Sequence, residues 1–166
     1  MILVIMGVCG CGKSTIGAAL AANLGWRFFD ADDFHPPANV AKMAAGMPLD
    51  DADRWPWLDR IAGDLAAMLA RGEHAVLACS ALKQSYRDRL ARAGDVRFVH
   101  LVGDYDTIAA RLADRKHRYM PSSLLQSQFA TLEAPQDALD VDVSDSVDTQ
   151  VATIRAAHGL MSAIAS

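Results

Sequence analysis

The stretch that decides the fold is Gly7-Val8-Cys9-Gly10-Cys11-Gly12-Lys13-Ser14. It matches the pattern GxxxxGK[ST] at every defined position. The apolar run 2–6 comes directly before it, and the helix-like stretch 13–24 begins at its end. A buried strand that ends in a glycine-rich turn and opens a helix is the setting in which this pattern forms a phosphate-binding loop.

The residue types of this loop suit a polyphosphate. Glycines let several backbone N–H groups face inward, and the new helix directs its N-terminal dipole at the same anion. Lys13 can reach the β- and γ-phosphates, and the Ser14 hydroxyl can take one position on Mg²⁺. A glycine-rich turn without a ligand is the alternative, which the agreement of strand, spacing, lysine and hydroxyl disfavours. We expect ATP and Mg²⁺ to bind here, on Gly7, Val8, Cys9, Gly10, Cys11, Gly12, Lys13, Ser14 and Thr15.

Composition excludes several classes of protein. The 166 residues are 52% hydrophobic and 22% charged, as expected of one globular domain spanning 1–166. The net charge of −4 argues against nucleic-acid binding, which needs a basic face. No apolar run approaches the ~20 residues of a membrane span. The N-terminus does not have the pattern of a signal peptide, so we expect a cytoplasmic protein without a membrane partner.

The cysteines are odd in number: Cys9, Cys11 and Cys79. This predicts free thiols and no disulfide framework. Cys9 and Cys11 could form half of a metal site, but no second Cys or His pair at ligand spacing supports that reading. We therefore interpret both as small residues of the loop.

Strand-like and helix-like stretches alternate along the chain. The expected strands are 2–6, 27–30, 75–79, 96–101 and 139–143. The expected helices are 13–24, 37–45, 55–71, 83–93, 104–115, 122–132 and 147–164. This alternation predicts an α/β three-layer sandwich, with a five-stranded parallel sheet covered by helices on both faces. The segment 33–58, rich in proline and glycine around 36–48, is expected to be an insertion on the substrate side. In such a sheet, ligands bind at the carboxyl ends of the strands.

Acidic residues follow the second strand, in Asp30-Ala31-Asp32-Asp33-Phe34-His35. Carboxylates this close repel each other, so a cation is expected nearby. One could hold a water of the Mg²⁺ shell, and another could accept the proton of an attacking hydroxyl. A solvated acidic turn, with an aspartate capping the next helix, is the alternative. His35 is either a substrate contact or part of this turn.

Basic residues follow the third strand. Ser80 can cap the next helix or face the site, and Lys83 and Arg87 are spaced to share one helical face. Two cations on one face at this edge of the sheet suit a substrate carboxylate or phosphate. Solvated surface charge is the alternative for each of them.

A second basic cluster spans 111–118 and contains Arg111, Arg115, Lys116, His117 and Arg118. So many cations predict a compensating anion. A segment of about 115–123 that closes over ATP would supply transition-state charge and exclude water. The helix dipole is the alternative, and it accounts for Arg115 and Lys116 only.

The chain resembles gluconokinases of the small phosphate-loop type, which are akin to shikimate and adenylate kinases. Besides the loop, the blocks that carry the resemblance are 30–36, Asn39 with Lys42-Met43, Pro48 to Leu58, Ala78 to Lys83 with Tyr86-Arg87-Asp88, and Leu124 to Phe129 with Leu132-Glu133. They span residues 1 to about 135. The block Asp50-Asp51-Ala52-Asp53-Arg54-Trp55-Pro56-Trp57-Leu58 is far more specific than the phosphate loop.

The resemblance implies a nucleoside-monophosphate-kinase-like topology with a short lid. It also implies transfer of the γ-phosphoryl of ATP to the 6-hydroxyl of D-gluconate, with Mg²⁺, in a homodimer. Asp30 would be the metal-shell carboxylate, and Asp32 would lie next to the acceptor hydroxyl. Arg111 would lie near adenine, and Arg115 and Arg118 near the phosphates. The candidates for the gluconate carboxylate are Arg54, Lys83 and Arg87.

Two departures from the family pattern stand out. Family loops more often carry serine at the positions of Cys9 and Cys11, and their lid usually reads Gly-His where this chain has His117-Arg118. The rivals are a kinase for another polyol acid or a nucleotide, and a nucleotide-dependent switch without an acceptor. A guanine-binding switch needs an Asn-Lys-x-Asp motif, which the chain lacks.

Overall fold

A central parallel sheet organises the computed structural model, which describes residues 1–113 and 122–160. Within them, the strands are β1 (Ile2–Met6), β2 (Arg27–Asp30), β3 (Ala75–Ala78), β4 (Val96–Val102) and β5 (Ala138–Asp142). They pair in parallel in the order β2-β3-β1-β4-β5. This confirms the predicted five-stranded parallel sheet. β1 lies at its centre, so the loop after β1 emerges at the middle of the carboxyl edge, where ligands of such sheets bind.

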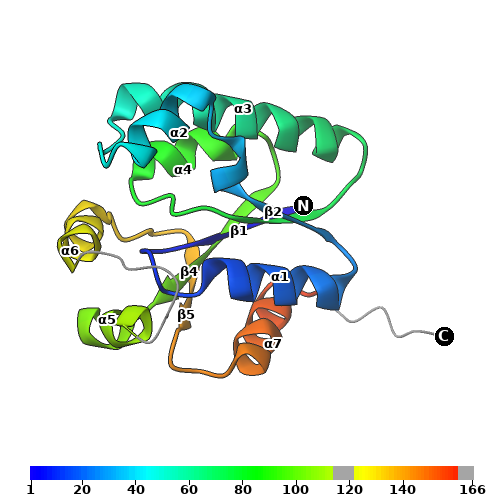
Figure 1. The fold of residues 1–166 in the computed structure, drawn as a ribbon. Coiled ribbons are helices and arrows are strands. Elements are labelled where there is room, and N and C mark those ends of the chain that lie inside the picture. The colour runs from blue at the N-terminus through cyan, green and yellow to red at the C-terminus, as the bar shows by residue number, and fades with distance from the viewer. Residues whose placement is uncertain (114–121, 161–166) are drawn as a thin grey trace.

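Helices cover both faces of the sheet. They are α1 (Lys13–Leu24), the 3₁₀ helix η1 (Ala31–Phe34), α2 (Pro37–Ala44), α3 (Asp51–Ala70), α4 (Gln84–Ala91), α5 (Tyr105–Ala113), α6 (Ser122–Thr131) and α7 (Val147–Ala157). Figure 1 shows α2, α3 and α4 above the sheet, α1, α5 and α7 below it, and α6 near the end at which β1 runs into the loop. The three-layer arrangement is therefore confirmed for the described residues.

The two faces of β1 build two separate cores. Ile2, Val4 and Met6 pack with α3 and α4, whereas Leu3 and Ile5 pack with α1 and α7. All of these strand residues are completely buried. Because side chains alternate across a strand, an uninterrupted apolar run marks a strand buried on both faces. This is why 2–6 could be recognised as an interior strand.

Several element boundaries differ from those predicted. Helix α3 begins at Asp51 and not at 55, because Asp50 and Asp53 form a reciprocal capping box. Helix α4 begins at Gln84 because Lys83 has extended backbone geometry (φ −93°, ψ 149°). Helix α7 ends at Ala157 and not at 164, since Gly159 at φ +63° turns the chain. Residues 114–121 and 161–166 lie outside the described part, and no helix of 1–113 or 122–160 could span a membrane.

Candidate active site

The phosphate loop presents open backbone donors at the start of α1. Gly12, the residue before this helix, has φ +103°, and a Cβ there would meet nothing within 4 Å. No side chain caps the helix, so its first N–H groups remain available to an anion. Lys13 Nζ donates to the Val8 carbonyl at 3.0 Å, and this hydrogen bond holds the ammonium group against the loop. This cradle fits a polyphosphate.

A cavity of about 420 Å³ opens beside the loop. Its lining consists of Gly10, Cys11, Gly12, Thr15 and Ile16 on one side and Arg111, Asp145, Ser146, Val147 and Gln150 on the other. The Arg111 guanidinium donates to the Val143 carbonyl, which fixes it to the segment after β5. The structure thus brings Arg111 and the phosphate loop, about a hundred residues apart in sequence, to one cavity.

The three cysteines are free thiols, as predicted. Cys11 is buried beneath the loop, and desolvation raises the pKa of its thiol. Burial raises the pKa of Cys79 to about 12. Neither forms the reactive thiolate readily, since the neutral thiol is favoured in an apolar environment. Cys9 is only half-buried and is the accessible thiol of the loop.

Iodoacetamide is expected to label Cys9 before Cys11 or Cys79 and to abolish ATP binding, because an adduct at Cys9 would obstruct the loop. Saturating ATP should slow the labelling. Peptide mass spectrometry with a parallel activity assay measures both effects. The variant Cys9→Ser should keep its activity and resist the reagent, and loss of activity through labelling at Cys79 would contradict this assignment.

Ser14 and Asp30 form the candidate metal side of the site. Ser14 Oγ donates to Asp30 Oδ2 at 2.8 Å, and the other carboxylate oxygen accepts from the Asp32 backbone N–H at 3.1 Å. Within the described residues, no three His, Cys, Asp or Glu side chains converge as a metal cage. A hydroxyl and one carboxylate still fit Mg²⁺, which commonly takes its other ligands from phosphates and water.

Asp32 and His35 follow Asp30, in the 3₁₀ helix η1 and at its end. The Asp32 side chain is 83% exposed, and its Oδ1 is 3.8 Å from His35 Nε2. The His35 side chain is only 4% exposed, because its ring stacks on Trp57 at 4.2 Å and Nδ1 lies 3.3 Å from Asn39 Nδ2. Burial lowers the pKa of His35, which favours the neutral ring. These contacts favour a positioning role for His35 within the turn.

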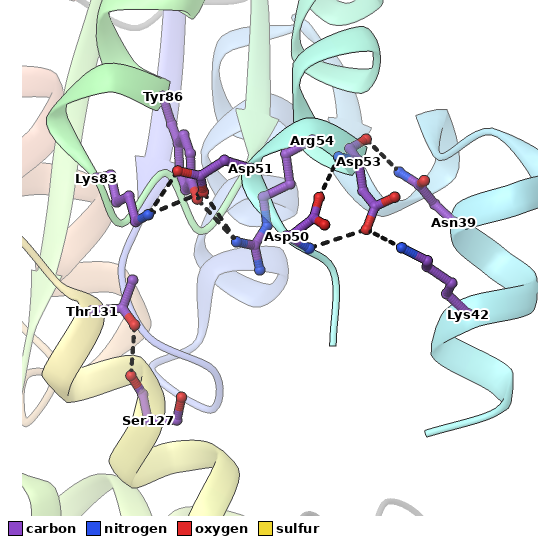
Figure 2. A network of polar contacts seen from close by, with 10 residues as sticks. All are labelled: Asn39, Lys42, Asp50, Asp51, Asp53, Arg54, Lys83, Tyr86, Ser127 and Thr131. Atoms are coloured by element: carbon purple, nitrogen blue, oxygen red, sulfur yellow. Dashed lines mark hydrogen bonds and ion pairs between the residues drawn. The ribbon is translucent and has the colours of Figure 1, made fainter. Parts of the chain in front are cut away.

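Arg54 and Lys83 meet around one carboxylate, that of Asp51 (Figure 2). Lys83 Nζ lies 3.0 and 2.9 Å from the two Asp51 oxygens, and Arg54 Nη1 lies 3.9 Å from Oδ1. The Tyr86 hydroxyl donates to Asp51 and accepts from Arg54 Nη1 at 2.9 Å. Hydrogen bonds from Tyr86 and Lys83 lower the pKa of Asp51, so the carboxylate stays ionised. The cluster therefore holds two cations and one anion.

The sequence assigned no role to Asp51 or Tyr86, although both lie in blocks that carry the family resemblance. Asp51 belongs to a run of acidic residues at the start of α3, and Tyr86 could equally be a core aromatic. Only the contact between α3 and α4 reveals that they organise Arg54 and Lys83.

The expected pairing of Lys83 with Arg87 on one helical face is wrong. Lys83 precedes α4 and points to Asp51, whereas Arg87 is turned inward and is 2% exposed. Its guanidinium donates to the carbonyls of Ala81, Leu82 and Glu133 at 2.9 to 3.1 Å. Arg87 thus braces the turn that carries Lys83. A buried arginine already bonded to these carbonyls is not placed to hold a substrate anion, so the candidate substrate set omits it.

Replacing Arg87 by methionine is expected to lower the free energy of unfolding by roughly 2–4 kcal/mol, because several buried carbonyls lose a charged donor. Urea denaturation followed by circular dichroism measures this loss. Arg92→Met is the matched control, since Arg92 is an exposed arginine at the end of the same helix. A loss no larger than that of Arg92→Met would contradict the bracing role.

Two further expectations concern Ser80 and the basic cluster. Ser80 does not cap α4; its carbonyl accepts from the Gly7 N–H at 3.3 Å, so it lies against the phosphate loop. Ala81, next to it, adopts φ +43°, an uncommon conformation for a residue with a side chain. Arg115, Arg118 and most of the expected lid lie outside the described residues.

Comparison with known proteins gives the family. The family model described as "Shikimate kinase" matches residues 9–154. The chain is 44% identical to a probable gluconokinase of Mus musculus over 92% of its own length and 95% of that protein. It is 51% identical to a gluconokinase of Gluconobacter oxydans, covering 81% of this chain and 76% of the other. The chain belongs to the gluconokinase family.

A solved structure of this family agrees with the fold. The crystal structure of a gluconokinase from Sinorhizobium meliloti 1021 superposes with a TM-score of 0.83 at 42% identity, covering 95% of this chain and 94% of the other. Family membership makes the chain a phosphotransferase with a phosphate loop for nucleotide binding and a small-molecule substrate. Kinases of this fold require ATP and a divalent metal ion in general.

Proposed function

We propose that the protein transfers the γ-phosphoryl group of ATP to the 6-hydroxyl of D-gluconate, giving 6-phospho-D-gluconate and ADP. The observation that carries this proposal is the balance of charge around Asp51, where we propose that the acceptor substrate binds. Arg54 and Lys83 bring two positive charges against the single carboxylate of Asp51, which leaves one positive charge for one substrate carboxylate. A monoanionic sugar acid satisfies that balance, and the gluconokinases among the relatives support the choice.

In this mechanism, the residues around the phosphates of ATP neutralise the negative charge of the phosphates. Lys13 would leave the Val8 carbonyl for the β- and γ-phosphates, while the loop amides surround them. Ser14 and Asp30 are the proposed ligands of Mg²⁺, which would neutralise charge on the phosphates when bound. Arg111 is proposed to contact the adenine. Arg115 and Arg118 are proposed to approach the transferred group.

The acceptor side positions the hydroxyl. Asp32, exposed beside the Ser14–Asp30 pair, is proposed to orient the 6-hydroxyl and to accept its proton as the new O–P bond forms and the bond to ADP breaks. Arg54 and Lys83 would hold the carboxylate at the other end of the substrate. Ser80 and His35 would shape the wall between them. Catalysis then rests mainly on positioning and on charge stabilisation.

The proposal extends to assembly and location. We propose a homodimer, as the family resemblance implies, that acts in the cytoplasm on a small-molecule substrate. The net charge of −4 disfavours a nucleic-acid partner, and no helix of the described residues could span a membrane. Light scattering after size-exclusion chromatography tests the dimer, and an elution mass near 17.8 kDa would contradict it.

The deciding experiment for the reaction is ATP turnover by coupled ADP release. Gluconate is compared with its epimers, glycerate, shikimate and AMP. Strong stimulation by gluconate alone is the expected result. Stimulation by another polyol acid would reassign the acceptor, and weak turnover unaffected by every acceptor would instead indicate a nucleotide-dependent switch.

A further inference from the structure

Helix α6 and the two residues after it, 122–133 and here called the α6 segment, contact the phosphate loop and the turn before α4 through side chains five positions apart. Gln128 Oε1 accepts from the Cys9 backbone N–H in the phosphate loop at 2.6 Å. Glu133 Oε2 accepts from the Gln84 backbone N–H at 2.6 Å, and the Glu133 N–H donates to the Leu82 carbonyl at 2.9 Å. One wall is the phosphate loop, and the other is the turn that carries Lys83.

This segment is held in place by its apolar face. Leu125 is 1% exposed and belongs to the core beneath the sheet, where Phe129 packs against it. Leu132 contacts that core and also the core on the opposite face. The Leu132 N–H donates to the Gln128 carbonyl, which continues the helical geometry up to the residue before Glu133. Glu133 therefore follows directly on the last helical hydrogen bond.

The strands that lead into the two walls, β1 and β3, pair along their length, up to the Cys79 N–H and the Ile5 carbonyl at 3.0 Å. Beyond that bond, the backbone contact between the two walls is weak. The Gly7 N–H lies 3.3 Å from the Ser80 carbonyl, which is long for a hydrogen bond. The two α6 bonds are much shorter. Figure 2 shows α6, with Ser127 and Thr131, passing beneath Lys83. The arrangement is that of a helix spanning from the nucleotide side to the acceptor side.

We propose that α6 is a bridge that fixes the phosphate loop relative to the acceptor turn, with Gln128 and Glu133 as its positioning residues. The inference rests on the proposed function, because phosphoryl transfer needs the γ-phosphoryl and the acceptor hydroxyl in line. A displacement of about 1 Å between reacting groups costs on the order of 10²-fold in rate. A bridge acts on alignment, so its loss lowers kcat more than it raises the KM of either substrate.

A double-mutant cycle tests the bridge. Gln128→Ala and Glu133→Ala are each expected to lower kcat by about 10–10²-fold. The double variant should lose less than the product of the two single effects, because both changes weaken the same bridge. Gln126→Ala is the matched control: Gln126 is an exposed glutamine of the same helix, and its side chain makes no hydrogen bond within the described residues. Glu133→Gln, which keeps an acceptor oxygen, should retain most of the activity.

Two kinetic results would overturn the proposal. One is a kcat for Gln128→Ala equal to that of Gln126→Ala. The other is multiplication of the two single effects in the double variant, which would show two independent local contacts. Thermal melting by circular dichroism is recorded for each variant. If kcat falls only in variants whose melting temperature also falls, this result likewise contradicts the bridge.

Backbone amide exchange tests the bridge without any activity. In the unliganded protein, Glu133→Ala should speed hydrogen exchange at the Gln84 amide and also at the Cys9 amide on the far wall. Faster exchange at Gln84 with an unchanged Cys9 amide would overturn the proposal. If the wild-type protein shows no gluconate-dependent turnover, the proposed reaction fails, and this measurement still decides whether α6 links the two walls.

Discussion

Lys13→Ala is expected to lower kcat by at least about 10²–10³-fold, the usual cost of removing a preorganised group that stabilises transition-state charge. The α1 terminus and the loop amides remain, so ATP should still bind, although more weakly. The fold should survive, because the Val8 carbonyl is the only hydrogen-bond partner of the Lys13 ammonium within residues 1–113 and 122–160. Steady-state kinetics with ATP and gluconate, together with nucleotide titration by calorimetry, separate turnover from binding.

Lys42→Ala is the control for this change. Lys42 lies on α2 and pairs with Asp53 at 2.6 Å, away from the phosphate loop. Its replacement removes the same side chain and charge without touching the nucleotide. If Lys13→Ala and Lys42→Ala reduced kcat equally, the loss would reflect charge or fold, and the role of Lys13 at the phosphates would be refuted.

Asp32→Asn is expected to lower kcat by about 10²–10⁴-fold, the range for loss of a general base. The amide keeps the size of the side chain, but it cannot accept the hydroxyl proton. Because the Asp32 side chain is 83% exposed, the variant should fold normally. The KM for ATP should change little, since the loop, Ser14 and Asp30 are intact. Rapid-quench measurement of a single turnover isolates the chemical step.

Asp33→Asn is the matched control, because Asp33 is the neighbouring exposed carboxylate of the same 3₁₀ turn. It should behave like the wild type. Wild-type turnover in Asp32→Asn would remove Asp32 from the mechanism. Equal losses in the two variants would point to the summed negative charge of the turn and not to a base at one position.

The sequence by itself determined the sheet, the phosphate loop and the family. A run such as 2–6, apolar at every position, can be buried on both faces only in an interior strand, and the glycine pattern after it restricts the loop to a phosphate cradle. Lys13 and Ser14 could be named from the loop pattern, and Asp30 because it is the last residue of a strand. These are local signals, and α1 was predicted with its observed bounds.

The tertiary structure alone decided the partners of the charged side chains. From spacing, Lys83 and Arg87 suggested one cationic face, but one residue of extended backbone at Lys83 turned them in different directions. Arg87 became a buried brace, and Asp51 and Tyr86 became the organisers of Arg54 and Lys83. The contact of Gln128 with Cys9 joins residues 119 positions apart. Such pairings depend on how helices pack across the sheet, and no local pattern encodes them.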